Sequence, residues 1–280
     1  MIAVVYSGSK SAFWKIALNG KTVAECTTPG INPYLNEPKQ IMLQLHKNTT
    51  LINHAEQIKK IYVFAAGASS VAKQQELINT LVQFFKNSRI SVKDDLYGAS
   101  IAACYNETGI VGILGSGSNC AYFDGKKPEQ NNYGLGFILG DEGSANYFGR
   151  VLLKKYLEDK LPGDLKAKFD EKYNVDRAII LERVYKKPAV QHYLSGFFDF
   201  YIENRQHKVI IQLIDQAFER YFQIYLLPTL QKHPGKNVHF VGTVAGTFQD
   251  RLRLIAQKHD VSIISVTKEP IYNLLHYYAN

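Results

Sequence analysis

The stretch Gly134-Leu135-Gly136-Phe137-Ile138-Leu139-Gly140-Asp141-Glu142-Gly143-Ser144 decides how this sequence is interpreted. It brings four glycines and two adjacent carboxylates together directly before a predicted helix. Carboxylates are favourable in the first turn of a helix, so an acidic cap is one interpretation. A cap alone does not require four glycines, whereas flexible backbone beside a carboxylate suits hydrogen bonding to sugar hydroxyls. We therefore predict a ligand-binding role for Asp141 and assign none to Glu142.

Upstream lies a second glycine-rich turn, Gly115-Ser116-Gly117-Ser118-Asn119, which follows the β-rich run 110–114. Glycine lets the backbone turn sharply and direct several N–H groups toward one cluster of oxygens, as phosphate-binding nests do. The two serine hydroxyls add donors. An ordinary hairpin turn remains the alternative, because serine and glycine are common in turns.

Two adjacent carboxylates, Asp94-Asp95, end a predicted strand and precede a predicted helix at about 96–105. Either residue would serve as a helix N-cap, for which Asp is among the best residues. A carboxylate at this place would also accept the proton of an attacking hydroxyl in phosphoryl transfer. The sequence does not separate these two interpretations.

The segment Gly242-Thr243-Val244-Ala245-Gly246 follows a predicted strand and opens a helix. Small residues there let a planar ring or a phosphate approach the backbone closely, and a tightly packed strand-to-helix turn is the alternative. Neither G-x-G-x-x-G nor G-x-x-x-x-G-K-[ST] occurs, which excludes the common dinucleotide-binding and P-loop motifs.

An opening pattern of strand, Gly/Ser turn, strand and Asx-Gly turn occurs twice in the chain. The first copy has its turns at 7–9 and 19–20, and the second at 115–118 and 124–125. The copies lie further apart than solenoid repeats do, so the pattern predicts an internal duplication.

The duplication predicts two α/β lobes, residues 1–108 and 109–267, the second with a helical insertion at about 143–232. No Gly-, Pro- or Ser-rich linker divides them, so we expect intimately connected lobes around a cleft. A last helix at about 268–280 is predicted to pack back on the first lobe through its tyrosines. A homodimer interface is the alternative use of Tyr272, Tyr277 and Tyr278.

The composition is that of a globular protein with a substantial core, at 280 residues, 46% hydrophobic and 21% charged. No apolar run is long enough to span a membrane and the first residues do not resemble a signal peptide, so we expect a cytoplasmic protein without membrane contact. The net charge of +8 comes from dispersed lysine pairs, which disfavours nucleic-acid binding and suits anionic nucleotides. Cys26, Cys104 and Cys120 form no C-x-x-C pair, and we expect all three to be buried.

With these motifs in this order, the whole chain resembles the N-acetylglucosamine kinase and BadF/BadG/BcrA/BcrD ATPase family of the sugar kinase/Hsp70/actin superfamily. L-G-D-E-G-S is the most specific motif, joined by G-S-G-S-N, by D-x-x-G at 95–98 and by G-T-V-A. The resemblance implies an α/β, duplicated ribonuclease H-like (actin-like ATPase) fold, with mixed five-stranded sheets and two lobes around a nucleotide and sugar cleft. It also implies ATP-dependent phosphorylation of an amino sugar such as N-acetylglucosamine, with Mg²⁺ held mainly by ATP.

The resemblance assigns a role to each candidate residue, with Asp95 as the catalytic base. The residues implied for the phosphates and adenosine of ATP are Ser7, Gly8, Ser9, Lys10, Gly115, Ser116, Gly117, Ser118, Gly242, Thr243 and Ala245. The residues implied for the sugar are Asn32, Gly67, Ala68, Asn119, Gly136 and Asp141.

The first phosphate loop departs from the family pattern. The family reads like D-S-G-S-T-K-T-D-W, and its Asp helps to place Mg²⁺, but the matching stretch here begins with Tyr6 and carries Lys10 in a shifted position. A neutral tyrosine cannot replace a carboxylate in organising a hard cation. A catalytically weakened or inactive sugar-binding or regulatory protein is therefore the alternative function. A reductase-coupled ATPase is disfavoured, because its iron–sulfur cluster needs more closely placed cysteines.

Overall fold

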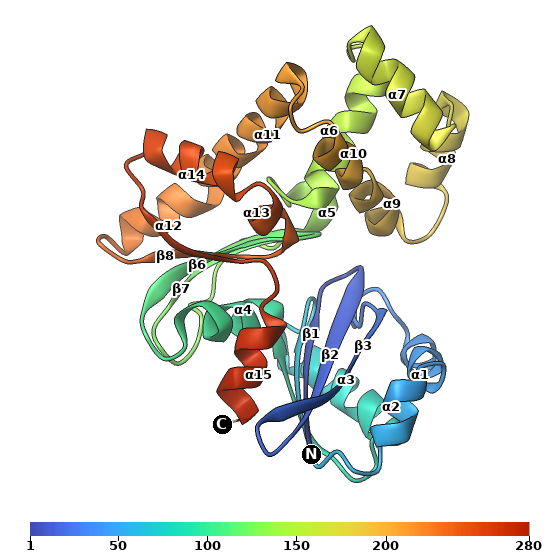
Figure 1. Ribbon diagram of the computed structural model, residues 1–280, viewed down its shortest axis with the longest axis vertical. Coiled ribbons are helices and arrows are strands. Elements are labelled where there is room, and N and C mark those ends of the chain that lie inside the picture. The colour runs from blue at the N-terminus through green and yellow to red at the C-terminus, as the bar shows by residue number, and fades with distance from the viewer. Residues whose placement is uncertain (280) are drawn as a thin grey trace.

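The computed structural model describes residues 1–279, which form two lobes, each built on one β-sheet (Figure 1). The strands are β1 (Ile2–Ser7), β2 (Ser11–Leu18), β3 (Lys21–Pro29), β4 (Lys60–Ala65), β5 (Arg89–Asp94), β6 (Gly109–Leu114), β7 (Ser118–Phe123), β8 (Val238–Val241) and β9 (Ile263–Thr267). The first sheet has the order β3-β2-β1-β4-β5 and the second has the order β7-β6-β8-β9.

Helices cover both sheets. In the first lobe they are α1 (Pro38–His46), α2 (Thr49–His54), α3 (Val71–Phe84) and α4 (Asp95–Cys104). The second lobe contains α5 (Gly136–Leu139), α6 (Ala145–Leu157), α7 (Gly163–Tyr173), α8 (Arg177–Tyr185), α9 (Val190–Gly196), α10 (Phe198–Glu203), α11 (Lys208–Tyr221), the π-helix η1 (Phe222–Leu226), α12 (Leu227–Lys232), α13 (Thr243–Thr247) and α14 (Gln249–Lys258). The last helix is α15 (Ile271–Ala279).

Both sheets are mixed, and their turns follow from local sequence. In the first lobe β1 and β2 are antiparallel, as are β2 and β3, while β1, β4 and β5 run parallel. Asn19 and Gly20 close the β2–β3 hairpin with φ values of 51° and 77°, the left-handed region that these residue types favour. The second lobe begins with a hairpin only, in which β6 pairs antiparallel with β7, and β6 also pairs parallel with β8.

The second sheet has four strands in the described chain, so the expected five-stranded form holds for the first lobe alone. After β7 the chain makes only an isolated bridge between Phe123 and Pro128. Proline has no N–H to donate to a strand ladder, and the polar residues that follow have low β-propensity. The chain instead runs on toward the glycine-rich stretch before α6.

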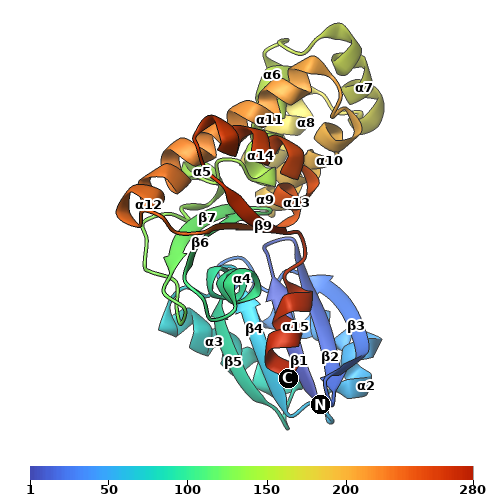
Figure 2. The same cartoon turned by 60° about the vertical axis from the view of Figure 1, so that its left-hand side comes forward.

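Helices α4 and α15 lie between the two sheets (Figure 2). They share one hydrophobic cluster with Val4 and Phe64 of the first sheet and with Val111 and Val241 of the second. The ring of Tyr278 stacks on Tyr62 at 4.1 Å, which ties α15 to the first lobe. The two sheets are thus joined through a packed interior, and residues at the start of α4 lie at the junction of the lobes.

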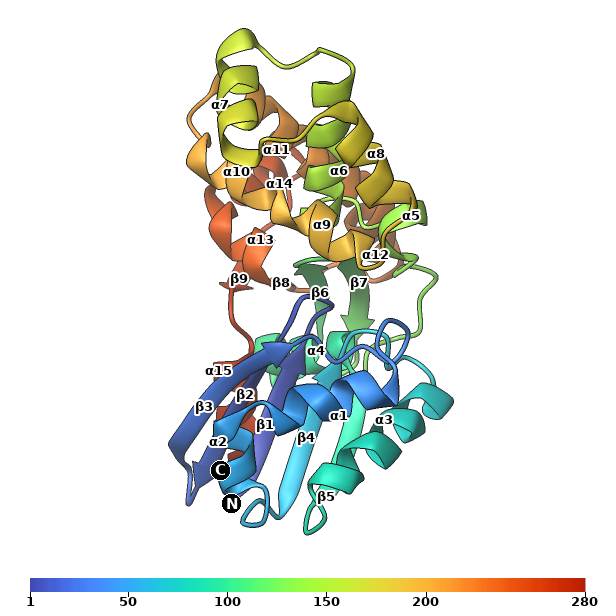
Figure 3. The same ribbon diagram turned by 90° about the vertical axis from the view of Figure 1, so that its right-hand side faces the viewer.

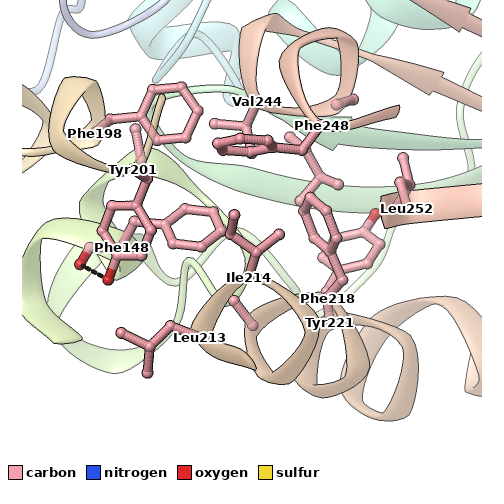
Figure 4. Close-up of a cluster of buried hydrophobic side chains, with 14 of the residues drawn as sticks. Phe148, Phe198, Tyr201, Leu213, Ile214, Phe218, Tyr221, Val244, Phe248 and Leu252 are labelled. Carbon is pink, nitrogen blue, oxygen red and sulfur yellow. Dashed lines mark hydrogen bonds between the residues drawn. The ribbon is translucent and has the colours of Figure 1, made fainter. Parts of the chain in front are cut away.

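An aromatic core holds the helices of the second lobe together (Figure 4). Phe148 on α6 packs against Phe198, Tyr201 and Phe218, and the Tyr201 hydroxyl donates to the Phe148 carbonyl at 3.0 Å. Side chains of this size each bury a large apolar area, so the insertion is anchored firmly to the second sheet. Figure 3 shows α6, α7 and α10 on the side of the second sheet away from the first lobe, whereas α9 lies closer to the first lobe.

The cysteines differ from one another in exposure. Cys104 and Cys120 are buried as expected, but Cys26 is only partly buried, which corrects the expectation for that residue. Cys26 lies on β3, an edge strand with one face open to solvent. Within residues 1–279, no helix is long and apolar enough to cross a membrane.

Candidate functional site

The two adjacent carboxylates at the start of α4 have different roles in the structure. Asp94 is the N-cap, because its side chain accepts a hydrogen bond from the backbone N–H of Tyr97 at 2.7 Å. Asp95 is the first residue of the helix. The pKa of Asp95 is raised to about 7, first by burial of its carboxyl, then by the charge of Asp94, with a smaller contribution from Asp141 of the other lobe. A carboxyl with this pKa exchanges a proton readily at neutral pH.

Tyr6 lies on β1, which pairs parallel with β4, and β4 separates it from β5, the strand that ends at Asp94. Burial, and then the charges of Asp95 and Asp94, raise the pKa of the Tyr6 phenol well above its usual value. The phenol is therefore neutral near pH 7. No anionic oxygen stands at this point of the first loop.

Hydrogen bonds to buried groups and to neighbouring backbone hold the turn after β1 in place. The Ser7 hydroxyl is buried and accepts a hydrogen bond from the backbone N–H of Ile31 at 2.8 Å. The Gly8 N–H donates to the Ser11 carbonyl, and the Lys10 carbonyl accepts from Gly30. Gly8 and Ser9 are partly exposed and Lys10 is exposed. These contacts fix the turn while leaving its outer residues able to meet a ligand.

The residues implied for the sugar in the first lobe lie next to this turn. Asn32 is buried and approaches the Ser9 hydroxyl, with its amide nitrogen 3.5 Å from the oxygen. Its side-chain oxygen also accepts from the Tyr34 N–H at 2.9 Å. Gly67 has a φ of 81°, and a β-carbon there would lie 2.3 Å from that same oxygen. Because of this φ and this close approach, only glycine fits at residue 67. The next residue, Ala68, is fully buried.

In the second lobe, the turn 115–118 is tied to the glycine-rich stretch. The first N–H groups of α6 donate to the carbonyls of Gly115 and Ser116, at 2.9 and 3.1 Å. The Ser118 N–H donates to a carboxylate oxygen of Asp141 at 3.1 Å, and Gly117 packs directly against that carboxylate. Burial raises the pKa of Asp141, although its hydrogen bonds oppose the rise. The turn and the carboxylate thus form one unit.

Asn119 and Gly136 lie at the edges of this unit. The Asn119 carbonyl accepts from the Tyr221 hydroxyl at 2.8 Å, and its side chain lies close to Gly134. Gly136 begins α5 with a φ of 77°. Asn119 therefore lies next to the turn that contacts Asp141, at one corner of the lobe.

The two lobes meet at the turns formed by residues 7–9 and 115–118. A β-carbon on Gly8 would lie 3.5 Å from the Ser116 hydroxyl oxygen, so the two turns face each other. His192 on α9 reaches across from the insertion, with its Nε2 atom 3.0 Å from the Ser9 carbonyl oxygen. The segment opening α13 joins the same place, because Gly242, with a φ of 120°, packs against the Leu114 carbonyl just before the second turn.

Two further candidate residues lie in α13, and two surface depressions lie beside α14. Thr243 is exposed at the start of α13, and Ala245 is buried. Two shallow depressions of about 250 and 360 Å³ lie beside α14, one reaching α11 and the other β9, and neither is lined by a candidate residue. Their linings mix polar and apolar side chains of the second lobe and include none of the candidate residues.

Besides His192, three contributors to the site were not predicted from the sequence. The Asn146 amide lies 3.4 Å from the second carboxylate oxygen of Asp141, the Tyr225 hydroxyl donates to Glu142, and Arg150 donates to the backbone before Asp141. Asn146 follows the glycine-rich stretch closely enough that proximity alone signals it. Tyr225 and Arg150 are brought in by helix packing, for which the local sequence carries no signal.

Known structures share this architecture. A candidate N-acetylglucosamine kinase from Porphyromonas gingivalis is 32% identical, with a TM-score of 0.92, over 100% of this chain and 99% of that one. A second candidate N-acetylglucosamine kinase, from Chromobacterium violaceum, is 16% identical over 99% of both chains, with a TM-score of 0.71. A ROK family glucokinase from Streptomyces griseus, solved with glucose and AMPPNP, is 12% identical over 99% of this chain and 97% of that one, with a TM-score of 0.58.

No protein-family model and no curated protein sequence matches the chain. The full-length match at 32% identity carries the assignment, and the more distant structures confirm the duplicated actin-like fold. This chain belongs to the N-acetylglucosamine kinase and BadF/BadG ATPase family of the sugar kinase/Hsp70/actin superfamily.

Proposed function

We propose that this protein transfers the γ-phosphoryl group of ATP to a hydroxyl of an amino sugar related to N-acetylglucosamine, with Asp95 as the general base. One observation carries the proposal. Asp94 takes the capping role, which leaves the carboxyl of Asp95 at the lobe junction, with its pKa raised to about 7 and within electrostatic reach of Asp141. A pKa near the working pH is what a base needs to accept a proton during the reaction.

The chain supplies groups for both halves of such a reaction. Asn32, Asn119 and Asp141 would hold sugar hydroxyls and direct one of them toward Asp95. The oxygen of that hydroxyl attacks the γ-phosphorus, its proton passes to Asp95, and the bond from the γ-phosphorus to the β,γ-bridging oxygen breaks to release ADP. The facing turns at Gly8 and Ser116 would hold the phosphates through backbone N–H and hydroxyl groups.

The protein groups at the turns fit phosphate better than they fit a cation. Within residues 1–279, no three His, Cys, Asp or Glu side chains cluster as a metal site would require. Mg²⁺ carried by ATP would neutralise charge on the phosphates when bound. Tyr6 offers it no anionic oxygen, so water and the phosphates themselves would have to complete its coordination.

The neutral, buried Tyr6 favours a second candidate function. A member that binds an amino sugar through Asn32, Asn119 and Asp141 but transfers phosphate weakly or not at all would act as a sensor. Losing one group that orients the metal costs several kcal/mol of transition-state stabilisation, roughly a hundredfold or more in rate.

A single pair of measurements tests both candidates. ADP release is followed with Mg-ATP and a panel of amino sugars, for the wild type and for Asp95→Asn, and sugar binding is measured by calorimetry. Sugar-dependent release that Asp95→Asn abolishes supports the kinase. Sugar binding without release supports the sensor, and absence of sugar binding would refute both.

A further inference from the structure

The segment that leads into Asp141 is exposed, although it is rich in apolar residues. We call residues 135–140, which contain α5, the flap. The side chains of Leu135, Ile138 and Leu139 are 58%, 72% and 75% exposed, and no residue of α5 is fully buried. Phe137 is the one apolar side chain of the flap that packs, partly buried, against the core of the second lobe, so burial of apolar side chains contributes little to holding the flap.

One side chain of the next helix holds the flap through its backbone. The Arg150 guanidinium donates to the carbonyls of Phe137, Ile138 and Gly140, at 2.6, 3.2 and 3.4 Å. Its planar face lies over the ring of Tyr147, 5.3 Å from the ring centre. Arginine presents several donors in one rigid plane and stays charged at every relevant pH, so it can bind three carbonyls at once.

Asp141 follows directly on the last of these three carbonyls. It has a φ of 62°, a conformation that a non-glycine residue adopts only when its surroundings hold it there. On its other side it is fixed by the Ser118 N–H. The direction of the carboxylate therefore depends on both anchors, and the Arg150 charge also lowers the pKa of Asp141, against the larger effect of burial.

We propose that Arg150 is a positioning residue, which clamps the flap and thereby sets the orientation of Asp141 toward the bound sugar. The inference rests on the proposed sugar site, and it assigns Arg150 no contact with the substrate. A displacement of about 1 Å in a binding group can lower efficiency by roughly a hundredfold. Removing the clamp should therefore weaken sugar binding while leaving the nucleotide side, held by the turns and α13, intact.

The test compares Arg150→Met, which keeps much of the stem, with Lys154→Met one turn later on α6. Lys154 has a 73% exposed side chain and only a 3.8 Å ion pair to Glu158, so its loss controls for a removed charge on the same helix. Each protein is titrated with N-acetylglucosamine and, separately, with Mg-AMPPNP. Amide hydrogen exchange is followed in the flap.

We expect Arg150→Met to raise the dissociation constant for the sugar by a factor of about 10 to 100 and to speed exchange of the flap amides. Lys154→Met should change neither, and both proteins should bind AMPPNP like the wild type. Unchanged sugar affinity, or equal losses for sugar and nucleotide, would overturn the role of Arg150. If Arg150→Met does not fold, Arg150→Lys serves, because one ammonium cannot span three carbonyls.

Failure of the proposed function would be distinguishable. A wild type that binds none of the amino sugars would refute the sugar site itself, and the flap exchange rates would still decide whether Arg150 is the clamp. Protection that is equal in Arg150→Met and the wild type would refute it.

Discussion

Replacing Asp95 by Asn should stabilise the protein at alkaline pH. The pKa of this carboxyl lies at about 7 instead of 3.8, so the folded state binds its proton more tightly than the unfolded state does. A difference of about three pKa units corresponds to at most about 4 kcal/mol. The residue keeps partial exposure, and its charge favours the start of a helix, so we expect a net gain of about 1–3 kcal/mol from Asp95→Asn at pH 8.

The sign of the effect follows from linkage. Below about pH 4 the carboxyl is protonated in both states, and the substitution should change little. As the pH rises toward 7, the unfolded state loses its proton first, so the wild type loses stability that the Asn variant retains. The gain should therefore grow between pH 4 and 7 and stay constant above that range.

Urea unfolding at pH 4.5, 6 and 8 measures this directly. The matched control is Asp176→Asn, an exposed N-cap of α8 whose side chain accepts from the Ile179 N–H at 2.8 Å. The control should show no gain that grows with pH. If the Asp95→Asn protein is no more stable than the wild type at pH 8, the pKa of Asp95 is not raised. The observation that supports Asp95 as the base would then be wrong.

The other predictions concern the same site. Asp94→Asn should keep the cap but remove a neighbouring charge, lowering the pKa of Asp95, so the acid limb of the kcat/KM profile should move about one unit lower; an unmoved limb would assign it to another group. Tyr6→Asp should raise turnover about tenfold or more at saturating Mg²⁺ if the missing acid limits the rate, and no gain in a folded, ATP-binding variant would discard that account. Gly67→Ala should cost about 1–3 kcal/mol in urea unfolding and weaken sugar binding, because a φ of 81° and the contact with Asn32 leave no room for a methyl group. A stable Gly67→Ala protein with normal sugar affinity would mean that the loop shifts freely.

Much of the fold is predictable because its signals are local. Asn19-Gly20 and the Gly/Ser turns predict the antiparallel hairpins that begin each lobe, and the resemblance implies how the strands pair in the sheets. The missing fifth strand of the second sheet was not foreseen, although Pro128 is a local reason for it. Cys26 was expected to be buried because its neighbours are apolar, but edge position, which decides its exposure, is a property of the sheet.

In the candidate site, too, local sequence signals predicted some features, and contacts between distant segments were not predicted. The sequence located Asp94 and Asp95 but could not distinguish cap from base, since one chemistry serves both roles. The hydrogen bond from the Tyr97 N–H identifies Asp94 as the cap, and the role of Asp95 as base remains the proposal. His192 was not foreseen, because the contact joins residues 183 positions apart in the chain. Such a contact depends on how the insertion packs, and Gly149, pressed against the Leu194 carbonyl, shows how closely α9 approaches α6.

The hydrogen bond between the Ser118 N–H and Asp141 has a consequence for how the two halves of the reaction are linked. It joins the turn at 115–118 to the Asp141 carboxylate, and the N–H groups at the start of α6 donate to two carbonyls of the same turn. In the proposed reaction, a sugar that displaces Asp141 would therefore also displace the turn at 115–118, which would hold the phosphates. Because the facing turn belongs to the other lobe and is touched by His192, closure of the lobes and alignment of the two substrates would be one event. In the proposed reaction, such closure would exclude water, which a kinase requires to avoid hydrolysing ATP.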